Sequence, residues 1–424
     1  MKKDFTLKYG KGTIEFSLDR ELVLDEIRMK AFDGLKYPKK EILEAINNPI
    51  GCKPFKENFT PGDKVAFIVN DSTRIANSYQ FLPVMMDELN SMGIPDEDMF
   101  IIFALGAHRA MRQEEMVTEV GEAVAGRVKM HNGDCHDKDQ FKYFGTTSFG
   151  TPVAFHKLVA EADRIICTGS VLPHYLAGYG GGRKAMLPGV AWYETIRNNH
   201  SMIFDPNSKV SKLHGNPVYD DQIEAVEMCR PTFLINVVLN EKKETVRVFA
   251  GDYINAHIEA CKFVDEIYVT DIKEEADLVI ISSGGYPKDI DIYQLHKTMI
   301  NGWCAVRQGG IVIVVGECRD GSGSDTYEQI MQEHKTPERV EKATRANFQV
   351  GAHKAYGVTS LMYKAQFILV SEVDEALAKM LQFTPAKDMD AALTIAFEKL
   401  GKKPKIIVMP QGSFTLPRVK KTNS

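Results

Sequence analysis

The sequence lacks an excess of basic residues. Its 424 residues include 52 Lys and Arg against 57 Asp and Glu, which gives a formal net charge of −5. Proteins that hold nucleic acid through its phosphates need a surplus of Lys and Arg on the binding surface. We therefore expect no nucleic-acid partner.

Long apolar runs are also missing. No run approaches the roughly 20 residues of a membrane-spanning helix, and residues 1–8 lack the apolar stretch of a signal peptide. The seven cysteines are dispersed and form no CxxC pair, which disfavours a disulfide framework and a Cys-rich zinc site. These absences predict a cytoplasmic protein with reduced thiols and no membrane partner.

What the sequence does contain is a repeated pattern of β-branched apolar runs, each followed by a polar or Gly-rich loop and a helix-like segment. Continuous apolar runs that alternate with helices are typical of parallel sheets covered on both faces. We therefore expect an α/β fold, with two domains built on mostly parallel sheets and an active site at the strand C-terminal ends between the domains. The expected strands are Lys64–Asn70, Met99–Leu105, Arg164–Gly169, Asp277–Ile281, Gly310–Val315, Phe367–Val370 and Lys405–Met409.

The domain boundary is expected near residue 270. Phe233–Phe249 is typical of a hairpin, and a charged helical segment follows from Ala256 to about Glu275. This predicts a first domain over residues 1–270 and a second over residues 271–424. About the last 15 residues are expected to pack back on the first domain.

Polar side chains follow several of the expected strands. Asp71 and Arg74 follow one strand, His108 follows the next, and His174 follows a third. Tyr293, Gln294 and Lys297 come after a strand in the second half of the chain. Ligands of open α/β sheets bind beyond the carboxyl ends of the strands. These side chains are therefore candidates for a binding or catalytic site.

The most unusual segment runs from Ser170 to Gly189 and has glycines at positions 178, 180, 181 and 182. It is not a Walker A loop, because Arg183 and Ala185 stand where Gly and Ser or Thr are required. Lys184 within it is a candidate for covalent attachment of a cofactor, since a partly desolvated amine is nucleophilic.

Two metal-binding hypotheses remain open at this point. The imidazole of His200 could ligate nickel, zinc or copper. The cluster between His131 and Asp137, which includes Cys135 and His136, is an alternative, although its spacing matches no standard zinc pattern.

Over nearly its whole length the chain resembles the nickel-dependent lactate racemase family. The matching segments are Asp71-Ser72-Thr73-Arg74, Gly106-Ala107-His108, Pro173-His174-Tyr175, Gly181-Gly182-Arg183-Lys184, Pro188-Gly189 with Tyr193-Glu194-Thr195, Asn199-His200, Gly284-Gly285-Tyr286-Pro287, and Tyr293-Gln294 with Lys297. The segment Gly351–Tyr356 also looks like the family and could close the pocket from the second domain.

The resemblance implies a cofactor and the residues that hold it. The cofactor is a nickel(II) pyridinium-3,5-bisthiocarboxylate mononucleotide, a nickel pincer nucleotide tethered to a lysine and made by separate cofactor-biosynthesis enzymes. By resemblance, Lys184 is the tether and His200 is the metal ligand. The loop residues Asp71, Ser72, Thr73 and Arg74 would help to hold the nucleotide.

The resemblance also implies the reaction, which is racemisation or epimerisation of a small, lactate-like 2-hydroxy acid. The substrate would give a hydride reversibly to the cofactor while a base takes its hydroxyl proton. His108 and His174 look like the two acid/base residues, one for each enantiomer. Gln294 and Lys297 look like substrate anchors, and Arg74 could assist them as a bidentate partner.

Two departures leave the substrate open. Ile75 follows the Asp71–Arg74 loop where proline is expected, and Ala177 stands where a lactate enzyme would have a small hydroxyl residue. An epimerase of malate, an aldonate or a longer 2-hydroxy acid is therefore an alternative. Two more distant hypotheses are a pyridoxal-phosphate enzyme with its Schiff base at Lys184 and a non-enzymatic small-molecule-binding protein.

Overall fold

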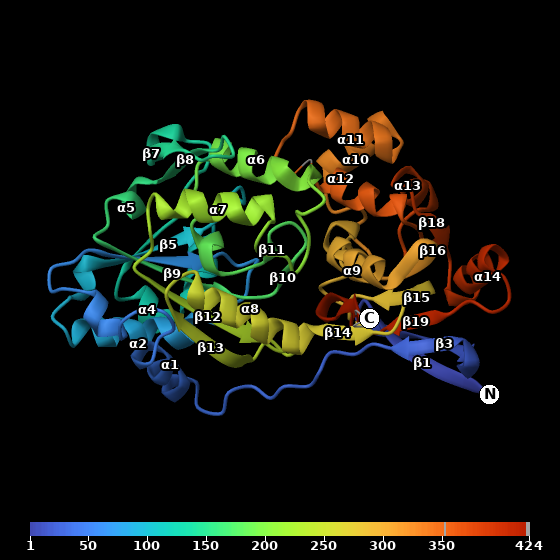
Figure 1. Ribbon diagram of the computed structural model, residues 1–424, viewed down its shortest axis with the longest axis horizontal. Helices are drawn as coiled ribbons and strands as arrows, with labels where there is room; N and C mark the ends of the chain where they lie inside the picture. The colour runs from blue at the N-terminus through green and yellow to red at the C-terminus, as the bar shows by residue number, and fades with distance from the viewer. Residues whose placement is uncertain (352, 421–424) are drawn as a thin grey trace. The chain divides into compact units, whose positions relative to one another are not determined.

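The computed structural model describes residues 1–351 and 353–420, which form two compact units (Figure 1). Residues 31–266 form the first, named here the central unit. Residues 1–30 and the residues from 267 onward form the second, named here the terminal unit because both ends of the chain belong to it. Each unit is described by itself.

Six strands form the main sheet of the central unit, in the order β13-β12-β9-β4-β5-β6. All neighbours run parallel except β13, which is antiparallel to β12. Pairing of β4 with β5 runs from Val65 opposite Met99 to Asn70 opposite Ala104, so these two strands end at the same level. The strands are β4 Val65–Asn70, β5 Met99–Ala104, β6 Lys129–His131, β9 Arg164–Ser170, β12 Phe233–Leu239 and β13 Thr245–Gly251.

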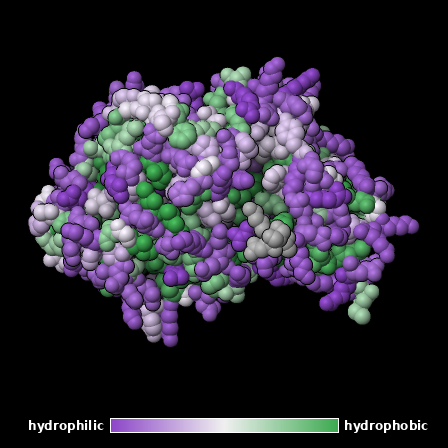
Figure 2. Space-filling view, in the orientation of Figure 1, coloured by the Kyte–Doolittle hydropathy of each residue, from purple (hydrophilic) through white to green (hydrophobic). Residues whose placement is uncertain are grey.

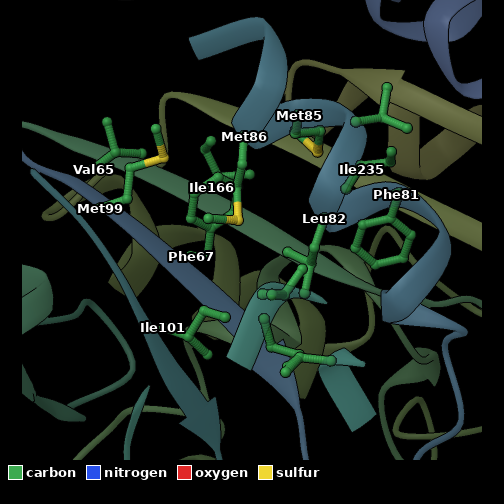
Figure 3. Close-up of a cluster of buried hydrophobic side chains, with 14 of the residues drawn as sticks. Val65, Phe67, Phe81, Leu82, Met85, Met86, Met99, Ile101, Ile166 and Ile235 are labelled. Carbon is green, nitrogen blue, oxygen red and sulfur yellow. The ribbon is translucent and has the colours of Figure 1, made fainter. Parts of the chain in front are cut away.

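Successive side chains of a strand point to opposite faces of its sheet, and both faces of the central sheet are covered. Val65, Phe67 and Val69 of β4 join a core with helices α1 to α4, and part of this core is shown in Figure 3. The 3-10 helix η5 (Gly182–Ala185) contacts β4 and β9. The helices are α1 Pro38–Asn47, α2 Ser78–Asn90, α3 Gln113–Val120, α4 Glu122–Ala125, α5 Lys157–Ala160, α6 Tyr193–Ser201, α7 Pro217–Glu227 and α8 Asn255–Tyr268.

Two short hairpins complete the central unit. The first pairs β7 (Phe141–Thr146) with β8 (Pro152–His156), and the second pairs β10 (Pro173–His174) with β11 (Gly178–Tyr179). The second hairpin lies within the Gly-rich segment that follows β9, so the chain here is folded back on itself rather than extended as a plain loop.

The main sheet of the terminal unit has the order β18-β17-β16-β15-β19-β3, and all its neighbours are parallel. The strands of this unit are β1 Lys2–Tyr9, β2 Gly12–Asp19, β3 Val23–Glu26, β14 Val269–Ile272, β15 Ala276–Ser282, β16 Val306–Val315, β17 Ala365–Val370, β18 Thr384–Ala386, β19 Ile406–Met409 and β20 Leu416–Val419. Its helices are α9 Ile292–Ala305, α10 Asp325–His334, α11 Pro337–Ala346, α12 His353–Thr359, α13 Glu375–Met380 and α14 Met389–Leu400.

The structure confirms the predicted α/β class, and all seven expected strands are present. The β12–β13 hairpin forms within the predicted segment. The helix expected to reach about Glu275 ends at Tyr268, because the chain pairs as β14 from Val269 onward.

The division of the chain differs from the expected one at residue 270 in two respects. Residues 1–30 belong to the terminal unit, because β3 pairs with β19 and Phe5 and Leu7 of the β1–β2 hairpin pack in that unit's core. Strand β20, expected to pack on the first domain, pairs with β14 inside the terminal unit. Residues 421–424 lie outside the described part of the chain.

The face shown in Figure 2 is mostly hydrophilic, with hydrophobic residues in small separate areas. Within the described ranges, no helix combines the length and the apolar character needed to cross a lipid bilayer.

Phe67 tests the core of the central unit. Its side chain is fully buried in this core, near Met86 and Ile166 in Figure 3. Phe67→Ala should lower the free energy of unfolding by about 3–5 kcal/mol, because a cavity remains and apolar contacts are lost. Urea unfolding followed by circular dichroism measures this change. The control is Phe149→Ala, since Phe149 is 44% exposed and its loss should have little effect. Equal effects of the two substitutions would contradict the assigned core.

Candidate active site

The loops that leave β4 and β5 meet at one edge of the central sheet. Asp71 directly follows β4 and is buried, whereas His108 follows β5 by four residues and its side chain is 49% exposed. Nδ1 of His108 is hydrogen-bonded to Oδ2 of Asp71. Because the two strands end at the same level, this contact follows from their register.

Hydrogen bonding keeps the Asp71 carboxylate charged. Burial alone would raise its pKa, but hydrogen bonds from His108 and Thr73 outweigh burial and lower it below its usual value. Oδ1 of Asp71 accepts from the backbone N–H of Thr73 at 3.0 Å and from its hydroxyl at 2.7 Å. An ionised partner accepts the Nδ1 proton of His108, so Nε2 of the neutral ring is left as a proton acceptor.

The rest of this loop is exposed. Ser72, Thr73 and Arg74 are all open to solvent, and Nη1 of Arg74 donates to the backbone oxygen and hydroxyl of Thr73 at 3.0 and 3.2 Å. Ile75, at the position where proline was expected, is 37% exposed. The loop therefore offers a hydroxyl, a guanidinium and backbone groups to a ligand, while Asp71 faces inward.

His174 has the opposite hydrogen-bond pattern to His108. It lies in the β10–β11 hairpin, and its Nδ1 accepts from the backbone N–H groups of Leu176 and Ala177, both at 3.2 Å. A nitrogen that accepts cannot carry the proton, so the neutral ring is protonated at Nε2. Ala177, where a small hydroxyl residue was expected, is fully buried.

The segment that carries Lys184 is fixed to the central sheet. Oδ1 of Asn236, from the buried strand β12, accepts the backbone N–H of Gly182 at 2.9 Å. Gly181 has φ +73°, and a Cβ there would lie 2.8 Å from the same Asn236 oxygen, so only glycine fits. Further along, Gly189 accepts from the N–H of Gly106, in the loop that carries His108, at 2.8 Å.

Arg183, directly before Lys184, is fully buried. Its Nε donates to Oε1 of Gln222 at 3.0 Å and its Nη2 donates to the carbonyl of Ala177 at 2.7 Å. The guanidinium also lies 4.6 Å from the centre of the Tyr219 ring. Burial lowers the pKa of Arg183 to about 10, which leaves it charged at neutral pH. The contact with Ala177 joins the Lys184 segment to the hairpin of His174.

His200 lies in the last turn of α6 and is 8% exposed. Its neighbour Asn199 is fully buried, and Oδ1 of Asn199 accepts from Nε2 of Gln222 at 3.2 Å. Gln222 therefore contacts both the residue before Lys184 and the residue before His200.

Four predicted site residues are thus connected within one unit. The segments of His108, His174 and His200 each join the segment of Lys184 through hydrogen bonds. Sequence reasoning missed Gln222, which makes one of these connections, and Asn236, which holds the Lys184 segment on strand β12. The only available signal was a polar side chain inside an apolar strand, Phe233–Leu239, in the case of Asn236.

The two predicted substrate anchors belong to the terminal unit. Gln294 and Lys297 are exposed and three residues apart on α9, which places them on one face of that helix. The backbone N–H of Gln294 donates to Oδ1 of Asp291 at 2.7 Å. In the family-like segment 351–356, Lys354 is buried with its Nζ 4.3 Å from the ring centre of Tyr293; residue 352 lies outside the described residues.

The alternative metal cluster between residues 131 and 137 gains no support. His136 packs against the ring of Tyr193, with the ring centres 4.5 Å apart, and burial raises the pKa of the Cys135 thiol to about 11. In the described part of the chain, no group of three or more His, Cys, Asp or Glu side chains is placed to hold a metal. A single imidazole such as His200 would need further ligands from a bound molecule to hold a metal.

A buried histidine beneath the glycine segment makes stability pH-dependent. Nε2 of His257 donates to the carbonyl of Gly180 at 2.8 Å, and burial lowers the pKa of His257 to about 3. The unfolded chain titrates this group near pH 6.5, so below that pH it binds a proton that the folded chain does not. The contribution of neutral His257 to the free energy of unfolding is therefore fully present above about pH 6.5 and is lost as the pH falls toward 3.

His257→Gln keeps a side-chain donor for Gly180 and removes the titrating group. Its free energy of unfolding should fall less between pH 6.5 and pH 4 than that of the unmodified chain, as urea unfolding at each pH measures. The control is His214→Gln, at an exposed position of the same unit, which should keep the original pH dependence. An unchanged pH dependence in His257→Gln would show that burial of this imidazole does not govern acid stability.

The chain is similar to known proteins over nearly its whole length. Residues 9–211 match the family model of the lactate racemase N-terminal domain, and residues 271–415 match that of the lactate racemase C-terminal domain. The lactate racemase of Thermoanaerobacterium thermosaccharolyticum is 31% identical over 423 residues, which cover 98% of this chain and 99% of that protein. The lactate racemase of Lactiplantibacillus plantarum is 30% identical over 415 residues, which cover 96% and 97%.

Solved structures give the same result. The apoprotein of the T. thermosaccharolyticum lactate racemase superposes with a TM-score of 0.91, covering 98% of this chain and 100% of that one at 31% identity. A protein from Thermotoga maritima shares the fold, with a TM-score of 0.68 at 17% identity over 93% of this chain. With both domain models matched and relatives aligned over nearly the full length, the chain belongs to the lactate racemase family and is an isomerase.

Proposed function

We propose that the protein racemises or epimerises a small 2-hydroxy acid, with lactate as the first substrate to test. The observation that supports this most strongly is that segments bearing three histidines and one lysine are hydrogen-bonded together in the central unit. Lactate is favoured because two relatives that match nearly the full chain are named lactate racemases. Malate, aldonates and longer 2-hydroxy acids are the alternative substrates.

The proposed cofactor is the nickel pincer nucleotide that the family resemblance implies, tethered at Lys184 with nickel on His200. The donor set suits it, because the amine of Lys184 can form a covalent link and a neutral imidazole nitrogen is a good nickel ligand. When bound, such a group supplies a reversible acceptor for a hydride from C2 of the substrate. Loading would depend on the cofactor-biosynthesis enzymes, which are the proposed protein partners.

Within the proposal, His108 and His174 move the hydroxyl proton. Removal of a hydride from C2 and a proton from the hydroxyl converts a 2-hydroxy acid into a transient 2-keto acid. Return of the hydride to the opposite face of C2, with a proton returned to the oxygen, gives the other enantiomer. In this proposal, Nε2 of neutral His108 accepts the hydroxyl proton, because Nδ1 is hydrogen-bonded to Asp71. Nε2 of neutral His174 carries the ring proton and would donate a hydrogen bond to the substrate oxygen. The two neutral rings therefore differ in tautomer, and either ring becomes a general acid only once it is doubly protonated.

The remaining residues bind and orient in this proposal. Asp71 fixes the tautomer of His108 by accepting the hydrogen bond from its Nδ1. Ser72, Thr73 and Arg74 would hold the nucleotide through exposed polar groups. Gln294 and Lys297, with Arg74, would bind the substrate carboxylate and hydroxyl, since an exposed ammonium and guanidinium can neutralise the carboxylate.

Lys184→Ala tests the tether. The protein is made together with the cofactor-biosynthesis enzymes, and its intact mass is measured. The unmodified chain should carry a nucleotide-sized adduct on the Lys184 peptide, whereas Lys184→Ala should lose the adduct and all racemase activity. The matched control is Lys209→Ala, at an exposed position of the same unit, which should keep both. An adduct that persists in Lys184→Ala would move the tether elsewhere.

His174→Ala tests the acid/base pair. The variant should retain the adduct, while turnover of either lactate enantiomer should fall by about 10²-fold or more, the usual scale for loss of a general acid or base. Enantiomer-resolved product analysis gives the rates, and the exposed His214→Ala serves as the control. Turnover equal to that of the control would exclude His174 from proton transfer. Binding without any turnover in the loaded unmodified chain would favour a sensor instead.

A further inference from the structure

A chain of hydrogen bonds runs through the buried interior of the central unit from a cation to an anion. Arg183 donates to Oε1 of Gln222 at 3.0 Å, and Nε2 of Gln222 donates to Oδ1 of Asn199 at 3.2 Å. Nδ2 of Asn199 then donates to Oδ2 of Asp221 at 2.8 Å. All four side chains are fully buried. Each bond therefore points the same way, from guanidinium to carboxylate.

The direction of every bond in this chain is fixed by chemistry. A guanidinium can only donate and an ionised carboxylate can only accept, so each of the two amides between them has one allowed orientation. Bonds aligned in this way polarise and strengthen one another in a low-dielectric interior. Either amide turned by 180° would leave buried groups mismatched, so the chain has one stable arrangement.

The far end of the chain is anchored to a hairpin. Asp221 accepts from the hydroxyls of Thr147 at 2.6 Å and Thr151 at 3.0 Å, residues that flank the turn between β7 and β8. Burial raises the pKa of Asp221 above its usual value, and hydrogen bonds from Thr147, Asn199 and Thr151 oppose that rise. The carboxylate is held from both sides.

This series of hydrogen bonds includes the neighbours of two residues of the proposed site. Arg183 is the residue before Lys184, and Asn199 is the residue before His200. Gln222, from the separate helix α7, is the link between the two. We propose that Gln222 is a positioning residue, which fixes the helix of the nickel ligand His200 relative to the segment of the tether Lys184. This inference rests on the proposed function and assigns Gln222 no contact with the cofactor.

If Gln222 had a purely structural role, its substitution would change only the free energy of unfolding. The test therefore measures the binding of nickel. Gln222→Met keeps the length of the side chain and removes both polar contacts. In protein made with the cofactor-biosynthesis enzymes, the Lys184 adduct should remain, because the tether is covalent. Nickel should leave about 10–100-fold faster in the presence of a chelator, the usual cost of losing support behind a metal ligand. The absorption bands of the nickel–sulfur chromophore should shift.

Two further variants make the test decisive. Gln222→Glu keeps the shape and the acceptor for Arg183, but a carboxylate cannot donate to Asn199, so nickel release should again be faster. It replaces Gln222→Met if that variant does not fold. The control is Glu224→Gln on the same helix. It weakens the two hydrogen bonds from Ser148 to Glu224, both at 2.6 Å, which do not belong to the series of hydrogen bonds from Arg183 to Asp221. This variant should release nickel at the original rate.

The outcomes separate the two claims. If the unmodified chain carries no adduct when the cofactor is being made, the proposed function fails. If it carries the adduct and nickel, and the Gln222 variants release nickel at the same rate, only the positioning role is wrong. Loss of the adduct from a folded Gln222 variant would also overturn that role, since Gln222 would then act on the tether.

Discussion

The buried guanidinium of Arg183 is the constraint on which the arrangement of the candidate site depends. Burying a charge costs several kcal/mol unless its donors are satisfied. Here the partners found among the described residues are neutral: the Gln222 amide, the Ala177 carbonyl, the His257 imidazole and the face of the Tyr219 ring. Gln222 and Tyr219 lie on α7, His257 lies on α8 and Ala177 lies in the β10–β11 hairpin, so the contacts of Arg183 join these three elements. The side chain next to Lys184 thereby specifies the surroundings of Lys184.

The two histidine candidates are each held by hydrogen bonds from their own unit. His108 is held by Asp71 at the end of two strands with matched register, and His174 is held by two backbone N–H groups. The two rings have opposite tautomers because one Nδ1 faces a carboxylate and the other faces amide donors. The fold therefore sets which ring nitrogen of each histidine carries the proton when the ring is neutral.

Much of the fold was predictable from local pattern. Apolar runs such as Val65–Asn70 indicate buried parallel strands, and the rule that ligands bind at strand ends placed Asp71 and His108 at one edge, where they are in contact. The grouping of residues 1–30 with the terminal unit was not predictable, because β3 pairs with β19 across nearly the whole sequence and no local pattern indicates such a pairing.

The buried hydrogen bonds that connect the site segments were not predictable in the same way. Gln222 looks like an ordinary helix residue, and its role depends on Arg183 and Asn199, which are 39 and 23 residues away in sequence. Ala177 shows the same limit. The resemblance marks Ala177 as a departure from the lactate enzymes, but its side chain is fully buried and its carbonyl accepts a hydrogen bond from Arg183. Its influence on substrate choice would act through the backbone of the hairpin.

Isotope labelling at C2 distinguishes hydride transfer from proton abstraction. The cofactor-loaded protein is incubated with L-lactate deuterated at C2, and the products are resolved by enantiomer and by mass. We expect D-lactate that retains deuterium at C2, because the hydrogen leaves and returns as a hydride while His108 and His174 exchange only the hydroxyl proton. D-lactate with solvent hydrogen at C2 would exclude hydride transfer and indicate proton abstraction from carbon. No interconversion of lactate or of any other small 2-hydroxy acid by the loaded protein would contradict the proposed function itself.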